Sequence, residues 1–185
     1  DIPIQHIDDG ILRAMRRRGG SRAIRRAIHM AREAMPDIAL RTSLIVGFPG
    51  ETKAAFGGLS DFVRETRFDH LGVFAYSSEE GTAAAELPSR IGRKEAERRR
   101  ETILEEQAAI SLAINRTLVG STQEVLVEGR SDDPEYCYRG RLKRQAPEVD
   151  GLTYIRGRSL KPGDIVTARI VSAAEYDLFA RTPAP

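Results

Sequence analysis

Residues 38–76 combine a strand, a glycine turn and a helix in direct succession, followed by another strand. Residues 38–46 have strand character, and their apolar end at 44–46 is typical of a strand covered on both faces. The turn GFPGET follows at 47–52, residues 52–66 repeat apolar side chains at helical spacing, and residues 71–76 form the next strand. This order and spacing predict a βαβ unit with parallel strands.

Helices flank this unit on both sides. Apolar periodicity predicts a short helix from Ile7 to Met15 with Asp8 as its N-cap, and a second helix that Ser21 caps and Pro36 ends. Residues 93–118 predict one long helix, whose first half is almost wholly charged. Such a charge run favours a solvated helix face, and the helix suits a connector between domains.

The last third of the chain has the period-two pattern of short strands. Turn signals separate five candidate strands, at 123–127, 136–142, 152–156, 165–170 and 176–180. They predict a small all-β antiparallel barrel of OB-like type. We therefore expect an α/β domain over 1–92, a connecting helix over 93–114 and the barrel over 115–185.

Composition narrows the class of protein. Of 185 residues, 41% are hydrophobic and 30% charged, which predicts a globular chain, and the formal net charge of +2 is too small by itself to mark a nucleic-acid binder. The chain has no long apolar run and no visible signal peptide, so we expect a cytoplasmic protein. The single cysteine, Cys137, excludes an internal disulfide and a cysteine-built metal site within this chain.

Three groups of residues can carry chemistry. The turn at 47–52 either brings backbone close to a ligand or needs its glycines only for their dihedrals. Gln5 and His6 could contact a ligand at another strand end, although a lone histidine is more often structural. In the barrel, basic residues alternate with Tyr136 and Tyr138, which fits either an oligonucleotide site or a solvated edge strand; the basic residues are Arg139, Arg141, Lys143 and Arg144.

Longer motifs resemble the radical S-adenosylmethionine methylthiotransferases, over essentially the whole chain. The matching segments are DIPIQH at 1–6, ILxxMxR at 11–17, LRTSLIVGFPGET at 40–52 and FxYSxEEGT at 74–82, and the remainder is similar to the family's C-terminal TRAM domain. The resemblance implies a fold of half a radical-enzyme (βα) barrel followed by the TRAM barrel. It also implies S-adenosylmethionine and two 4Fe–4S clusters as cofactors of the intact enzyme.

Two branches of the family compete. One modifies a tRNA adenosine, and the other adds a methylthio group to the β-carbon of an aspartate in ribosomal small-subunit protein S-twelve. The segments APEVDG at 146–151 and EYDLF at 175–179 are similar to the second branch, which we favour. A non-enzymatic RNA- or protein-binding module remains the rival class. The barrel, with a charge near neutral, is expected to recognise protein more than RNA.

The resemblance also implies site residues. Eight residues at strand ends would hold the cofactor: Gln5, His6, Arg41, Ser43, Gly47, Phe48, Phe74 and Tyr76. Arg139, Arg141 and Arg144 would contact the substrate. The family's cluster cysteines are absent and Gln145 stands where the pattern has an aspartate. We therefore expect a fragment of a longer enzyme that holds no catalytic residue or metal ligand and is inactive alone.

Overall fold

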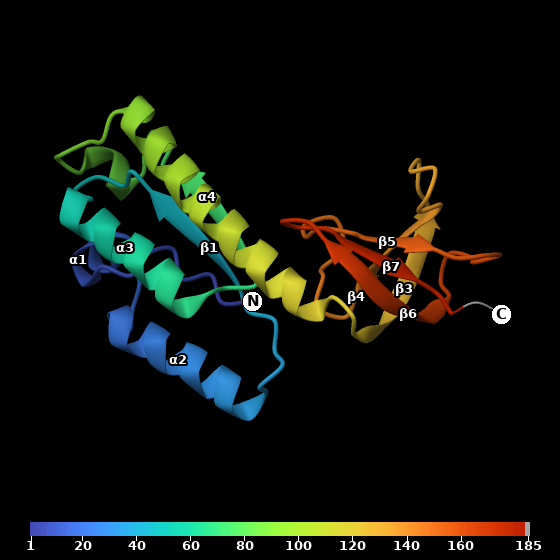
Figure 1. Cartoon of the computed structure of the whole chain (residues 1–185). Helices are drawn as coiled ribbons and strands as arrows, with labels where there is room; N and C mark the ends of the chain where they lie inside the picture. The colour runs from blue at the N-terminus through green and yellow to red at the C-terminus, as the bar shows by residue number, and fades with distance from the viewer. Residues whose placement is uncertain (184–185) are drawn as a thin grey trace. The chain divides into compact units, whose positions relative to one another are not determined.

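The computed structural model describes residues 1–183, and its contacts divide the chain into two compact units, Asp1–Ile110 and the residues from Ser111 onward. Figure 1 labels the helices and strands. The first unit contains α1 (Asp9–Ala14), α2 (Gly20–Ala34), β1 (Arg41–Val46), α3 (Lys53–Thr66), β2 (His70–Ala75), a short 3-10 turn (Ala83–Glu86) and most of α4 (Arg93–Leu118). The second contains β3 (Thr122–Arg130), β4 (Tyr138–Leu142), β5 (Thr153–Arg156), β6 (Ile165–Ala173) and β7 (Leu178–Arg181).

The predicted βαβ unit is confirmed. Strands β1 and β2 pair in parallel from Arg41 opposite His70 to the ends of both strands. Residues 2–5 run parallel along the other side of β1, where the Gln5 N–H donates to the Ser43 carbonyl at 2.9 Å. Three extended segments therefore end together at one edge of this small sheet.

The two faces of the sheet differ in burial. Thr42, Leu44 and Val46 on one face of β1 are fully buried, and Val73 of β2 lies beside Leu44. The other face carries half-buried β1 residues and Phe74, which is 59% exposed. The expectation of a strand covered on both faces was therefore wrong, because helices of this unit bury only one face.

Helix starts were predicted well with one exception. Asp8 caps α1, and Thr52 caps α3 by accepting from the Ala55 N–H at 3.1 Å. Ser21, however, is not the N-cap of α2. That position is Gly19, and the Ser21 N–H instead donates to Asp9 Oδ1 at 2.6 Å. The Asp9 carboxylate of α1 thus accepts a hydrogen bond from the first turn of α2, which the serine side chain was expected to do.

Helix α4 has the predicted bounds, but its charged half is not simply solvated. Ala96, Arg99 and Ile103 are 2%, 4% and 0% exposed and share one stripe of the helix. The interpretation of the charge run as a solvated face was wrong for this stripe, because Arg99 has a buried partner in the first unit.

The second unit is a closed five-stranded barrel with the order β3-β4-β5-β7-β6. All neighbouring strands are antiparallel except β5 and β7, which are parallel, so the wholly antiparallel arrangement that we expected is corrected. Its core holds nine buried side chains: Val125, Val127, Tyr138, Leu142, Ile155, Ala168, Ile170, Leu178 and Ala180. Since the sheet closes on itself, β4 is an interior strand and not the solvated edge strand that one interpretation assumed.

Gln145 joins three segments of the barrel. Its Oε1 accepts from the Leu142 N–H and from Thr153 Oγ1, both at 2.8 Å, and its Nε2 donates to the Gly151 carbonyl at 2.8 Å. The side chain is buried, and each of these polar atoms has a partner. The barrel thus accommodates a glutamine at position 145, where the family pattern has an aspartate.

Within residues 1–183, no helix is long and apolar enough to cross a bilayer. The same residues contain no group of three or more His, Cys, Asp or Glu side chains placed to hold a metal ion.

Candidate functional site

A buried carboxylate organises the turn after β1. Glu51 is 1% exposed, and its Oε2 accepts from the Gly47 N–H at 2.5 Å and from the Arg99 guanidinium at 2.7 Å. Arg99 also donates to the Glu51 carbonyl at 2.9 Å. The turn is therefore tied to α4 by an ion pair that water barely reaches.

His6 completes this network from the N-terminal segment. Its Nδ1 accepts from the Asp8 N–H at 2.9 Å, so its Nε2 carries the proton and donates to Glu51 Oε1 at 3.1 Å. The ring is 0% exposed and both nitrogens are engaged. The His6 side chain thus has internal partners on both ring nitrogens, and its contact with a cofactor stays a prediction.

Gly47 is required for packing. Its φ of +75° favours glycine, and a Cβ built there would lie 2.4 Å from the Ala96 Cβ of α4. Packing and the dihedral explain this glycine without a ligand, and its place in a cofactor site stays a prediction.

A second carboxylate holds Arg99 from its own helix. Glu95 Oε1 accepts from Arg99 Nε at 2.9 Å, and both Glu95 oxygens accept from Arg98 at 2.8 Å. Hydrogen bonds from Arg98 and then from Arg99 lower the pKa of Glu95 from 4.5 to about 2. The guanidinium of Arg99 thus lies between two carboxylates, one buried and one partly exposed.

A hollow of about 480 Å³ lies where the parallel segments end. Gln5, Ile45 and Phe48 line it together with Met15, Arg16, Arg17, Ala83 and Ala84. The Phe48 ring meets the Tyr76 ring edge-on, with 5.0 Å between centroids. In the described part of the chain, Tyr76 Oη is buried and has no hydrogen-bond partner. The hollow thus combines aromatic and apolar walls with an amide and two guanidinium groups.

Three other predicted residues share the open face of the sheet. Arg41 and Ser43 are half-buried on β1, and Phe74 lies on the same face of β2, since Ile45 is its partner in register. Within a parallel sheet, ligands collect near the carboxyl ends of strands. Gln5, Phe48 and the open face are therefore brought together in one region, whereas His6 and Gly47 lie behind it.

Sequence reasoning missed several residues of this region. Glu51 and Arg99 were not singled out as a pair, because 48 residues separate them and nothing local links them. Met15, Arg16 and Arg17 were read only as a helix end and a motif. Their approach to the strand ends depends on how α1 folds back against the sheet, which periodicity does not report.

The three barrel arginines do not act as one basic patch. Arg139 is exposed, whereas Arg141 Nε donates to Glu128 Oε1 at 2.7 Å across the β3–β4 pair. Arg144 is half-buried and already has a partner within the protein. Tyr138 is a core residue, 4% exposed, and not a surface aromatic as predicted. Of the three, Arg139 is the exposed one, and the contact of these arginines with a substrate stays a prediction.

Near Arg139 the structure shows a cluster of three aromatic rings that the sequence did not reveal. Phe179 of β7 packs edge-on against Tyr136 at 5.0 Å and stacks on Tyr154 of β5 at 5.5 Å. Arg139 is opposite Tyr154 in register, and Arg139, Tyr154 and Phe179 line a hollow of about 460 Å³ that also contains carboxylates. Tyr154 and Phe179 come from β5 and β7, and Tyr136 lies in the segment just before β4, so only the folded barrel brings the three rings together.

Comparison with known proteins agrees with both units. Residues 119–182 match the model of the TRAM domain. The chain is 59% identical over 182 residues to a protein of Syntrophus aciditrophicus, and 51% identical over 179 residues to one of Citrifermentans bemidjiense. Each match covers 97% of the chain and 40% of the relative. A protein of an Anaeromyxobacter strain is 49% identical over 184 residues, which is 100% of the chain and 39% of the relative.

The chain is therefore a TRAM-containing homologue of methylthiotransferases that modify a ribosomal protein. All three relatives carry the name ribosomal protein uS12 methylthiotransferase RimO, and the chain is homologous to part of the RimO proteins. It spans about 40% of the length of the curated relatives that it matches.

Proposed function

We propose that this chain is part of an S-adenosylmethionine-dependent methylthiotransferase that acts on uS12, the small-subunit protein S-twelve. The observation that carries the proposal is the match of 47–59% identity to RimO proteins along nearly the whole chain. The relatives named here are uS12 enzymes, which favours that branch over the tRNA branch. The chain would supply the part of the cofactor site that lies at the ends of β1 and β2, together with the TRAM barrel.

The first unit would be half of a (βα) barrel. In such a barrel the helices lie outside and the inner face of the strands lines the site. The one-sided burial of β1 and β2 supports this assignment, because Arg41, Ser43 and Phe74 would then face the barrel interior. The rest of the barrel would come from the part of the relatives that the chain does not span.

The residues around the hollow fit S-adenosylmethionine. Phe48 and Ile45 offer flat and apolar surface for an adenine ring, and Gln5 offers an amide for its edge. Ser43 and Arg41 would meet ribose hydroxyls or the methionine carboxylate. Tyr76 Oη, which has no partner in residues 1–183, is a further polar group at this end of the sheet.

The 4Fe–4S clusters of the family supply the electron for cleaving S-adenosylmethionine and, in this family, the sulfur chemistry. Cys137 is the only cysteine of the chain, and residues 1–183 show no metal-ligand cluster. In the proposal the cluster ligands belong to the remainder of the enzyme, and this chain's residues bind and orient the cofactor.

A chimera tests the cofactor site. The matching segment of the Syntrophus relative would be replaced by this chain, and S-adenosylmethionine affinity measured by equilibrium dialysis. Ser43→Leu should weaken binding about tenfold or more, because it fills the open face, whereas the exposed control Lys53→Gln should not. Ser43→Thr should retain most of the affinity. Unchanged affinity in Ser43→Leu, with the fold intact by circular dichroism, would contradict the assignment.

The barrel is proposed to contact uS12 through Arg139 and the Tyr154–Phe179 stack. A nearly neutral barrel has little long-range attraction for phosphates, while an arginine beside two rings suits a protein surface. The chimera should bind uS12, and Arg139→Gln should weaken that binding. Tight binding of a tRNA anticodon stem-loop with a steep salt dependence, and none of uS12, would favour the tRNA branch or an RNA-binding module instead.

A further inference from the structure

The charge of the first unit is strongly segregated even though its total is balanced. Residues 10–32 contain eight arginines and no aspartate or glutamate. The net charge of the whole chain is only +2, so this segment carries a local excess that the total conceals. Five of the eight lie within the ten residues 13–22, and the structure brings them to a single place.

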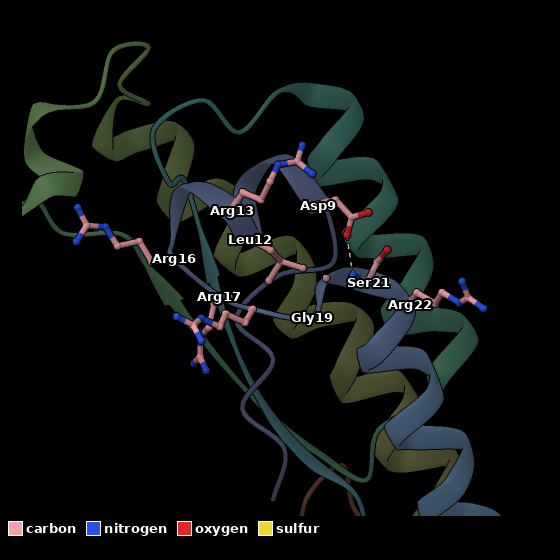
Figure 2. Close-up of a pocket in the computed structure, with 10 residues that line it drawn as sticks. Asp9, Leu12, Arg13, Arg16, Arg17, Gly19, Ser21 and Arg22 are labelled. Carbon is pink, nitrogen blue, oxygen red and sulfur yellow. Dashed lines mark hydrogen bonds between the residues drawn. The ribbon is translucent and has the colours of Figure 1, made fainter.

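These five side chains form what we call the arginine surface: Arg13, Arg16, Arg17, Arg18 and Arg22. They line a hollow of about 580 Å³ at the turn between α1 and α2, and all five are exposed. Figure 2 shows the labelled arginines fanning outward from this turn in different directions. A long anion that wraps around the turn suits this arrangement better than a single compact ion.

The arginine surface lacks internal partners. Within residues 1–183, none of its five side chains makes a hydrogen bond or an ion pair, whereas Arg25 of the same segment pairs with Glu65 at 3.2 Å. The one carboxylate in the lining is Asp9. Its pKa is lowered chiefly by the hydrogen bond from the Ser21 N–H, so it stays charged and offsets one of five positive charges.

The chemistry of the lining selects the partner. Leu12 is 1% exposed, so the hollow offers no apolar or aromatic anchor for a peptide, a nucleotide base or a membrane. Binding there would be electrostatic, through guanidinium forks that match phosphate oxygens. Repeated phosphates along a polymer satisfy several outward-pointing arginines at once.

We propose that the arginine surface binds RNA through its phosphate backbone without reading sequence. The choice of RNA over DNA rests on the proposed function, because a ribosomal protein substrate is surrounded by RNA. Arg16 and Arg17 line both this hollow and the one at the strand ends. Bound RNA would therefore lie beside the proposed cofactor site.

Fluorescence anisotropy of the full chain with a labelled single-stranded RNA and an RNA hairpin tests the proposal directly, and it needs no cofactor or activity. The variant Arg13→Gln/Arg18→Gln/Arg22→Gln spares the two arginines of the cofactor hollow. Its matched control, Lys53→Gln/Arg93→Gln/Lys94→Gln, removes three exposed charges of the same unit that have no partner in residues 1–183. Arg139→Gln/Lys143→Gln tests the barrel.

The wild-type chain and both controls should bind RNA, with affinity that falls as salt rises. The arginine variant should bind at least about tenfold more weakly and lower the magnitude of the log–log salt slope by about 2, as expected for three lost phosphate contacts. Equal RNA binding by the arginine variant and its matched control would overturn the proposal. So would tighter binding of poly-glutamate, anionic vesicles or a DNA hairpin of the same sequence than of RNA.

Because the assay measures binding alone, a failure here leaves the methylthiotransferase proposal standing. Conversely, the chimera could leave uS12 unmodified while RNA binding still depends on the arginine surface. That result would support the RNA site and reject uS12 as the substrate.

Discussion

Arg99 of α4 donates to both the carboxylate and the carbonyl of Glu51, at 2.7 and 2.9 Å, although 48 residues separate them. This contact fixes the turn after β1 against the helix that leaves the unit. His6 and Gly47 bind the same carboxylate from the N-terminal segment and the turn. The end of the sheet, where we place the cofactor site, is thus held by one buried ionic group.

Removing that carboxylate should destabilise the first unit strongly. Glu51→Gln leaves one acceptor oxygen for three donors, and buried Arg99 keeps only the partly exposed Glu95 as its counter-charge, so we expect a loss of up to about 3–5 kcal/mol. The control Arg98→Gln, on a side chain that is 59% exposed, should change stability by about 0.5 kcal/mol or less. Urea denaturation measures both.

The double variant Glu51→Gln/Arg99→Met measures the coupling energy between the two residues. It should lose less stability than the sum of the two single variants, because neither buried charge is then left alone. Simple additivity would show that the two residues do not act as a pair.

Gly47 and Gly50 form a matched pair of turn glycines. Both have positive φ, +75° and +85°, but only a Cβ at Gly47 meets a neighbour. Gly50→Ala should therefore cost about 1 kcal/mol for its dihedral alone. Gly47→Ala should cost about 1–3 kcal/mol more, because it overlaps Ala96.

Ala96→Gly provides the check on this explanation, since it removes the Cβ that Gly47→Ala would overlap. Alone it should destabilise α4 by about 1 kcal/mol, yet in the Gly47→Ala background it should restore the part of the stability that the Cβ overlap removed. Equal losses for Gly47→Ala and Gly50→Ala in thermal unfolding would mean that packing against α4 is unimportant.

Gln145→Ala should weaken the barrel. The change leaves the Leu142 N–H and the Gly151 carbonyl without their partner, which costs about 1–3 kcal/mol. Gln123→Ala, which removes one hydrogen bond to Ser121 from a half-buried side chain, should cost clearly less. A loss of amide-exchange protection in residues 140–153 would locate the effect. Equal losses of stability in the two variants would argue against a bridging role for Gln145.

Glu95 gives the stability of the first unit a defined pH dependence. Its pKa is about 2 in the folded protein and 4.5 ordinarily, so folding is favoured by its ionised form. That contribution is complete above about pH 5 and is lost as pH falls through 4.5 toward 2. The stability difference between wild type and Glu95→Gln should therefore shrink over this window.

Glu101→Gln is the control for this titration, because Glu101 lies on the same helix and makes no hydrogen bond or ion pair in residues 1–183. Urea midpoints from pH 6 downward should show the loss in the Glu95 comparison and not in the Glu101 comparison. A Glu95 difference that is constant with pH would refute the assignment of the shift.

Local patterns predicted most elements, since helix periodicity, caps and turn residues are local. The bounds of α4 and the parallel pairing of β1 with β2 follow from such signals. What the sequence did not reveal depends on contacts between distant segments. The Glu51–Arg99 pair, the parallel closure of β5 on β7 and the Tyr136–Phe179–Tyr154 group all require the chain to be folded first.

The candidate site divides in the same way. The motif residues Gln5 and Phe48 do line a hollow, whereas His6 and Gly47, from the same motifs, serve the framework behind it. Motif membership alone does not separate these roles, because burial and hydrogen-bond partners decide which side chains face a ligand. The net charge of the whole chain conceals the regional arginine excess, because acidic residues elsewhere balance it.

Mass spectrometry of uS12 and of tRNA nucleosides from the same cells distinguishes the uS12 activity from the tRNA activity. The cells would lack their own uS12 methylthiotransferase and carry the chimera of the Syntrophus relative with this chain. We predict that uS12 gains one methylthio group on an aspartate, that Ser43→Leu abolishes the gain, and that tRNA is unaffected. An unmodified uS12 from cells in which the folded chimera modifies tRNA would contradict the account.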